Sequence, residues 1–197
     1  MAESYLERFA YSQIPVFPVP LRMPVNLIAA EAQQLRSRMV VHRRPGWRRI
    51  CLHGLRAAQT GRPEAYGYEK DRDAPYDWTE IADECPASVR FIRRLPYKRF
   101  YRVRFMLLEP GGEIPIHADQ DEPCLGPLNI AVTHPADCHF YMEGFGEIPF
   151  TPGKGYLLNL CHRHWVVNSS QEDRYHMIVH GQHDQKRLDR LLLAGFD

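Results

Sequence analysis

Short β-like runs, each closed by a turn, fill the chain from residue 100 onward and constrain its fold more than any other feature. Eight of them follow one another: FYRVRFMLL, EIPIH, PLNIAVTH, HFYME, GEIPF, GYLLNL, HWVVN and RYHMIVHG. Clusters such as EPGG, HPAD, TPGKG and NSSQED separate them, and their Pro, Gly, Asn and Asp residues typically end strands. The pattern predicts a β-sandwich or jelly-roll barrel rather than alternating βα units.

The segments that flank these runs predict an arm and several helices. Four prolines within residues 14–25 favour an extended segment on the surface. After a possible N-cap at Asn26, apolar residues at roughly helical spacing predict one amphipathic helix. Its apolar positions are Leu27, Ala30, Leu35 and Met39. Two short helices are expected around WTEIADE and ASVRFIRR, and a closing helix over DQKRLDRLLLAGF.

Composition excludes several classes of partner and compartment. Lys and Arg number 25 against 24 for Asp and Glu, so no overall field attracts nucleic acid or an anionic membrane. The five cysteines form no C-x-x-C pair, which indicates reduced thiols rather than a disulfide framework. Residues 1–17 lack a basic segment followed by an apolar one, so we expect a cytoplasmic protein. Oligomeric state stays undetermined.

His117 and Asp119 form an H-x-D tripeptide at the end of EIPIH. Residues i and i+2 of a strand project from one face, so this imidazole and carboxylate can reach the same metal ion. The tripeptide alone is weak, because chance supplies roughly half an instance in a chain of this composition. Two ligands also hold a transition metal poorly, so a third is needed downstream.

His164 is the preferred third ligand. It stands ten residues before Arg174, across a polar turn, so both side chains can enter one cavity from successive strands. A face of two histidines and one carboxylate leaves three metal positions open for substrate and O₂. The planar fork of Arg174 is suited to bidentate pairing with a carboxylate.

In these segments the chain resembles the Fe(II)/2-oxoglutarate-dependent dioxygenases, specifically their aspartyl/asparaginyl β-hydroxylase-like branch. EPGGEIPIHAD, GPLNIAVTHP and GKGYLLNLCHRHWVVNSSQEDRYHMIVHG carry the resemblance in that order, over about residues 100–182. It implies a mainly β fold with flanking helices around a double-stranded β-helix (jelly-roll, cupin-like) core. We expect a single domain over 1–197: an arm, helices and loops over 1–98, a catalytic core over 99–182, and a C-terminal helix over 183–197.

The resemblance also implies roles for individual residues. His117, Asp119 and His164 would be catalytic as the ligands of Fe(II), and Arg174 would bind the distal carboxylate of the cosubstrate 2-oxoglutarate, with Asn129 as a further polar contact. The implied reaction hydroxylates an amino acid, free or as an aspartyl/asparaginyl-type residue of a peptide or protein, with O₂, and forms succinate and CO₂. The best-known animal members lack the carboxylate ligand, whereas this sequence keeps Asp119, so the substrate stays open.

Arg102 and Arg104 lie on the strand face of Met106 in YRVRFML. A buried arginine needs an anion, and either 2-oxoglutarate or an acidic substrate could supply one, most readily to Arg104. An internal salt bridge or exposure at the strand end is the alternative.

Several other residues have a structural interpretation beside a functional one. His162 shares the strand face of His164 and is its main rival as a ligand. His176 and His180 either orient a ligand or are satisfied polar residues. Asp121 is expected to be a loop charge.

Two further segments are interpreted as solvent-exposed loops. One is HPAD, with His134 and Asp137, and the other is RRPGWRR, residues 43–49, which could alternatively grip an acidic substrate. Two other functions compete with the leading one: a cupin-like metal isomerase or hydrolase that does not use 2-oxoglutarate, and a non-catalytic barrel that binds a ligand or partner.

Overall fold

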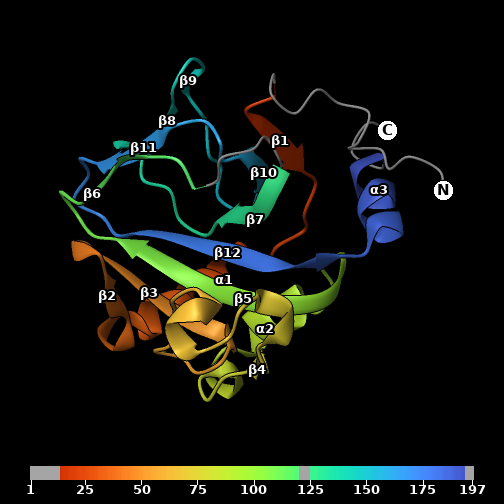
Figure 1. The fold of residues 1–197 in the computed structure, drawn as a ribbon. Helices are drawn as coiled ribbons and strands as arrows, with labels where there is room; N and C mark the ends of the chain where they lie inside the picture. Colours follow the sequence, from red (N-terminus) through yellow and green to blue (C-terminus); the bar gives the residue numbers. More distant parts are fainter. Residues whose placement is uncertain (1–13, 120–124, 194–197) are drawn as a thin grey trace.

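The computed structural model describes residues 14–119 and 125–193 of the chain (Figure 1). The strands are β1 Val16–Val19, β2 Val40–His42, β3 Arg44–Gly54, β4 Asp77–Trp78, β5 Tyr97–Leu108, β6 Glu113–His117, β7 Leu125–Ala131, β8 Cys138–Met142, β9 Gly146–Glu147, β10 Gly155–Asn159, β11 His164–Asn168 and β12 Arg174–His183. The α-helices of the described residues are α1 Val25–Gln34, α2 Pro86–Ile92 and α3 Gln185–Leu193.

Two antiparallel sheets form the core of the fold. The larger runs in the order β1-β10-β7-β12-β5-β3-β2, with β4 paired to β3, and the smaller runs β6-β11-β8-β9. In Figure 1 the smaller sheet lies on one side of the long strands β5 and β12, and helices α1 and α2 lie on the other. All eight predicted strands are present as β5 to β12, which confirms the mainly β, double-stranded β-helix prediction.

Strand β5 shows how the larger sheet separates two cores. Val103, Phe105 and Leu107 belong to the cluster that also contains the buried residues of α1 and α2. Met106 and Leu108 alternate with them and belong to a second cluster, shared with the smaller sheet. The period of two in YRVRFMLL therefore assigns one set of side chains to the helical layer and the other to the interior of the barrel.

The N-terminal half extends the larger sheet at both edges. β1 pairs with β10, and β3 pairs with β5 along most of its length. The interpretation of residues 43–49 as a solvent-exposed loop is therefore wrong: most of RRPGWRR lies in β3, and its Trp47 is buried. Pro45 and Gly46 are typical of a loop. Here Gly46 takes a positive φ of 82° near the start of a strand that then continues regularly.

Helix α1 differs in phase from the prediction. It begins at Val25 without a side-chain cap, so Asn26 is not its N-cap. Leu27 is 62% exposed, whereas Ile28 and Ala32 are fully buried. Elsewhere α2 covers most of ASVRFIRR and begins one residue before it, at Pro86, and the tail contains α3 with Leu188 and Leu192 buried. WTEIADE forms only a 3₁₀ turn over Ala82–Glu84.

Within the described residues no helix is long and apolar enough to cross a membrane. The described cysteines, Cys51, Cys85, Cys138 and Cys161, are all free thiols. Reduced cysteines were expected, and these four agree with that expectation.

Candidate active site

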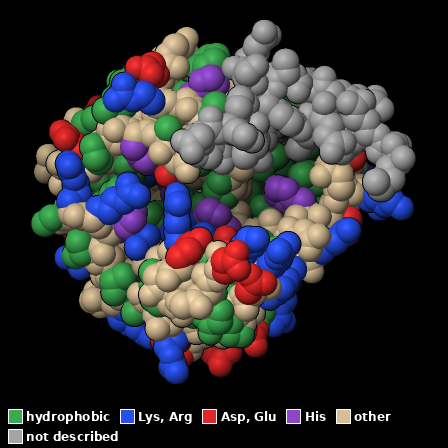
Figure 2. All heavy atoms as spheres, viewed as in Figure 1, with side chains coloured by type: hydrophobic (Ala, Val, Ile, Leu, Met, Phe, Trp, Pro, Cys, Tyr) green, Lys and Arg blue, Asp and Glu red, His purple; other side chains and the backbone are tan. Residues whose placement is uncertain are grey.

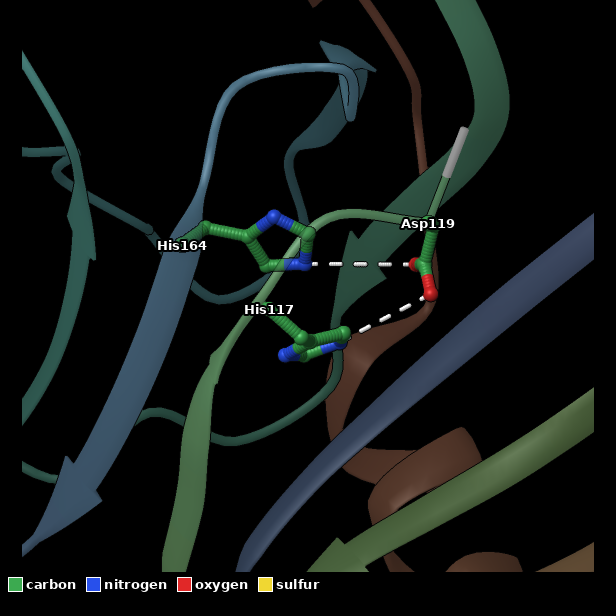
Figure 3. A group of neighbouring side chains, drawn as sticks. All are labelled: His117, Asp119 and His164. Atoms are coloured by element: carbon green, nitrogen blue, oxygen red, sulfur yellow. Dashed lines mark ion pairs between the residues drawn. The ribbon is translucent and has the colours of Figure 1, made fainter. Parts of the chain in front are cut away.

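The side chains of His117, Asp119 and His164 point toward one another between the two sheets (Figure 3). His117 ends β6 and His164 begins β11, where the two residues are register partners in adjacent strands. Asp119 follows β6, with its carboxylate oxygens 3.6 Å from His117 Nε2 and 3.9 Å from His164 Nε2. Two metal–ligand bonds of about 2 Å each can span such separations, so the three groups can hold one divalent ion.

Both imidazoles are fixed in the tautomer that a metal ligand requires. His117 Nδ1 lies 2.7 Å from the carbonyl oxygen of Pro115, and His164 Nδ1 lies 3.0 Å from that of His162. A carbonyl oxygen only accepts hydrogen bonds, so each Nδ1 carries the proton and donates it. In the neutral form of each ring, the lone pair is then on Nε2, the atom that faces Asp119.

Burial favours the neutral form of His164. The ring is 5% exposed and stacks on Phe140 at 5.5 Å, and desolvation lowers its pKa. The hydrogen bond to His162 and the charge of Asp119 act in the opposite direction on this pKa, and the proximity of His117 lowers it further. A neutral imidazole is the form that binds a metal.

Asp119 lies on the open side of the site. Its backbone N–H donates to the carbonyl oxygen of Leu160, which ties the segment after β6 to the end of β10. Its side chain remains 44% exposed, whereas that of His164 is 6% exposed. The buried ring fixes one side of the candidate metal position, and the carboxylate leaves the other side accessible from a cavity.

That cavity has a volume of about 840 Å³ and extends between the two sheets. All three metal-ligating candidates line it, together with residues from β3, β5, β7 and β12. On the face shown in Figure 2, Arg or Lys side chains and His side chains border a hollow near the centre. The site therefore combines a candidate metal position with a basic cavity.

Arg174 lies inside this cavity as a buried guanidinium that is 4% exposed. It hydrogen-bonds His176 Nδ1 at 3.1 Å and lies over the ring of Phe150 at 5.9 Å. Burial lowers its pKa to about 10. Among the described residues no carboxylate pairs with it, and its Nε has no hydrogen-bond partner there. An unpaired buried cation of this kind is suited to an anionic ligand.

Asn129 and Arg104 also line the cavity, but they belong to a different row of laterally paired residues across the larger sheet. The register pairs Ile178 of β12 with Asn129 on one side and with Arg104 on the other. Arg174 is instead paired with Leu108, four residues beyond Arg104 on β5, which corresponds to about 13 Å along the strand. The structure thus brings Asn129 and Arg104 into one row and places Arg174 apart from both.

The alternative candidates lie outside the metal position. His162 contacts Asn159 and Phe145, and its ring does not join the three ligating atoms. His134 is not an exposed loop residue as predicted: it packs against Phe150 and His176, and burial lowers its pKa to about 4. Asp121 lies outside the described residues.

His176 and His180 are both paired with arginines. His176 Nδ1 accepts from Arg174, and His180 Nε2 lies 2.9 Å from Arg104 Nη2. Burial lowers the pKa of each imidazole well below 6.5, and the nearby guanidinium charges lower it further. These neutral rings therefore hold arginines in place rather than a metal.

Trp47 and Arg49 are cavity residues that sequence reasoning assigned to a loop. The Trp47 ring lies 6.5 Å from that of His117, and Arg49 lies two residues further along β3. Trp47, Arg49 and Cys51 are spaced two residues apart, as side chains on one face of a strand are. Pro45 and Gly46, just before them, are typical of a loop and favoured the other interpretation.

Comparisons with known proteins define the class and then the family. The fold is similar to that of an oxidoreductase of the 2OG-Fe(II) oxygenase family from Burkholderia pseudomallei, with a TM-score of 0.50 at 13% identity over 88% of this chain and 89% of that one. A Pseudomonas putida prolyl-4-hydroxylase is similar at a TM-score of 0.50 and 13% identity, over 87% and 94%. A prolyl hydroxylase from Trichoplax adhaerens, in complex with a hypoxia inducible factor peptide, gives 0.50 and 10%, over 91% and 88%. The chain therefore has the fold of the 2-oxoglutarate- and Fe(II)-dependent oxygenases.

The sequence model of the Aspartyl/Asparaginyl beta-hydroxylase family matches residues 25–184, which is most of the chain. The protein belongs to that family. It is therefore an enzyme, an oxygenase of the hydroxylase type. A search of curated proteins found no match to it.

Proposed function

We propose that this enzyme hydroxylates an amino acid, free or as an aspartyl/asparaginyl-type residue of a peptide or protein, with His117, Asp119 and His164 as its Fe(II) ligands. The observation that carries the proposal is the convergence of these three side chains on one wall of a cavity. The two imidazoles each donate from Nδ1 to a backbone carbonyl oxygen, so that Nε2 faces the metal position. The same cavity also holds Arg174, which is buried and has no carboxylate partner among the described residues. A metal position and an anion position in one cavity correspond to the two ends of 2-oxoglutarate.

The bound iron and cosubstrate supply oxidation by O₂, in which 2-oxoglutarate becomes succinate and CO₂ while the substrate gains a hydroxyl group. The chain holds and orients the reactants. Arg174 pairs with the distal carboxylate of 2-oxoglutarate, and its geometry is maintained by His176. Asn129, which lines the cavity beside Ile178 and not beside Arg174, is a further polar contact for the cosubstrate. The apolar wall formed by residues such as Met106, Phe140 and Val166 excludes water.

We further propose that the whole chain acts as one domain, with residues 99–182 as its catalytic core and with β1 to β4 extending the larger sheet. A reducing compartment, the cytoplasm, fits the four free thiols of the described residues. The substrate is a small molecule or a peptide that enters the cavity beside Asp119.

Substrate-dependent succinate formation tests the proposal. With Fe(II), O₂ and 2-oxoglutarate, wild-type protein should release succinate in response to at least one amino acid or short peptide of a panel rich in aspartyl and asparaginyl residues. His117→Ala should abolish this release while its circular dichroism spectrum is unchanged. His139→Ala is the matched control, because His139 pairs with Glu147 outside the cavity. Equal succinate release by wild type and His117→Ala would contradict the assignment.

A further inference from the structure

A second group of arginines, separate from Arg174, lines the same cavity. Arg102 and Arg104 project from β5 and are 6% and 8% exposed, and the half-buried Arg49 projects from β3. Arg49 is the register partner of Met106, so it lies diagonally across from Arg104. Burial lowers the pKa of Arg104 to about 10, and the charges of Arg102 and Arg49 lower it further.

The described residues do not neutralise this group. Asp71 pairs with Arg102 at 3.3 Å. Arg104 contacts only neutral partners, the carbonyl oxygen of Thr60 and the imidazole of His180. The Nε atoms of Arg49 and Arg104 are buried without a hydrogen-bond partner among the described residues. Three guanidinium groups thus share one described carboxylate, and burial of an unpaired charge is costly without an anion.

The group lies beside the metal site but away from Arg174. Arg49 and Arg104 line the same cavity as His117 and Asp119, and Trp47, two residues before Arg49 on β3, has its ring 6.5 Å from that of His117. Arg104 is the register partner of Ile178 and Arg174 is that of Leu108, so the two arginines lie about 13 Å apart along the sheet, with the Met106–His176 pair between them. One cosubstrate molecule bound at Arg174 and the metal therefore leaves this second arginine group free.

We propose that Arg49, Arg102 and Arg104 form a subsite that binds an oxyanion, a carboxylate or a phosphate, of the molecule that is hydroxylated. This inference rests on the proposed function, because it names a property of its substrate. Two planar forks without a described carboxylate partner present several donors to one oxyanion, and arginine is suited to carboxylate and phosphate alike. The subsite assigns Arg104 to the substrate, one of the two anions that the sequence left open for it.

Calorimetric titration of the full chain, anaerobic and with Fe(II) and saturating 2-oxoglutarate, tests the subsite while the Arg174 position is filled. The probes are N-acetyl-L-aspartate, its neutral isostere N-acetyl-L-asparagine, and inorganic phosphate. We expect at least one anion to bind about tenfold more tightly than the neutral compound, equivalent to about 1.4 kcal/mol. Preference for N-acetyl-L-aspartate identifies a carboxylate substrate, and preference for phosphate identifies a phosphorylated one.

Variants separate the subsite from the rest of the cavity. Arg49→Gln should remove the preference for the anion and leave 2-oxoglutarate affinity unchanged, and Arg104→Gln should do the same. Arg48→Gln is the matched control, because Arg48 pairs with Glu109 and does not line the cavity. Equal affinity of wild type for charged and neutral probes, or equal behaviour of Arg49→Gln and Arg48→Gln, would overturn the subsite. Failure of the wild-type protein to bind 2-oxoglutarate in the presence of Fe(II) would instead overturn the proposed function.

Discussion

His117 and His164 are register partners on the adjacent antiparallel strands β6 and β11, with their rings 4.4 Å apart. Strand pairing therefore brings the two imidazoles together without a metal. Hydrogen bonds from each Nδ1 to a carbonyl oxygen two residues earlier then set the direction of each Nε2. Only Asp119 lies beyond the paired strands, so two of the three candidate ligands are preorganised by the sheet.

Replacement of a candidate ligand should weaken metal binding specifically. We expect His164→Ala and Asp119→Ala to lower Fe(II) affinity by more than tenfold, because loss even of groups that only support ligands costs about 10–100-fold. Anaerobic equilibrium dialysis measures this affinity. His162→Ala is the control, since His162 is two residues away and faces Asn159 and Phe145. A loss of Fe(II) affinity in His162→Ala equal to that in His164→Ala would refute the choice of ligand.

Arg174 should control cosubstrate affinity without controlling the metal. Arg174→Gln removes the buried guanidinium, so we expect 2-oxoglutarate affinity to fall at least about tenfold, the effect of about 1.4 kcal/mol. Fe(II) affinity, measured by dialysis in the same preparation, should remain at the wild-type value. Unchanged affinity for 2-oxoglutarate would show that the distal carboxylate binds elsewhere.

Asn168 joins the end of β11 to two turns and should be important for stability. Its fully buried side chain donates to the carbonyl oxygens of Leu108, Glu109 and Glu172. Asn168→Ala removes these three buried hydrogen bonds, although Gly112 N–H still donates to Glu109 and Ser170 Oγ to Glu172. We expect the free energy of unfolding to fall by about 1–3 kcal/mol. Urea denaturation measures the change.

The neighbouring Ser169 provides the control for that stability measurement. It is exposed, and Ser169→Ala should change the free energy of unfolding by less than about 0.5 kcal/mol. Equal stability of Asn168→Ala and wild type would mean that water replaces the lost hydrogen bonds.

Buried neutral histidines should make the protein less stable as the pH falls. Burial holds the pKa of His176 well below 6.5 in the folded state, whereas in the unfolded chain the pKa of this histidine is about 6.5. Between these values the unfolded chain binds a proton that the folded protein does not, so stability rises with pH and is lost on acidification. Urea denaturation across this range should show a smaller pH slope for His176→Gln, by up to about 1.4 kcal/mol per pH unit. Identical slopes would contradict this role of His176.

The strands and the metal-ligating candidates could be predicted because their signals are local. A period of two marks β5 to β12, and the H-x-D spacing places Asp119 beside His117, although the strand ends at His117. The role of β3 could not be read in the same way, because Pro45 and Gly46 are typical of a loop and only pairing with β5 overrides that preference.

The second arginine group could not be predicted, because it depends on which strands lie side by side. Arg49 and Arg104 lie far apart in the chain, and they meet only because β3 lies beside β5. Likewise, the phase of α1 depends on which side packs against the sheet, so Ile28 is buried and Leu27 is exposed. Both features depend on tertiary pairing, whereas propensity reports only local preference.

Metal-dependent binding of 2-oxoglutarate tests the central claim most directly. Anaerobic calorimetric titration of 2-oxoglutarate into wild-type protein, with and without Fe(II), measures it. We predict one molecule bound per chain with Fe(II), with much weaker binding when Fe(II) is omitted or when His117→Ala and His164→Ala are combined. Absence of binding in the presence of Fe(II), or equal affinity with and without the metal, would contradict an Fe(II)- and 2-oxoglutarate-dependent site at His117, Asp119 and His164.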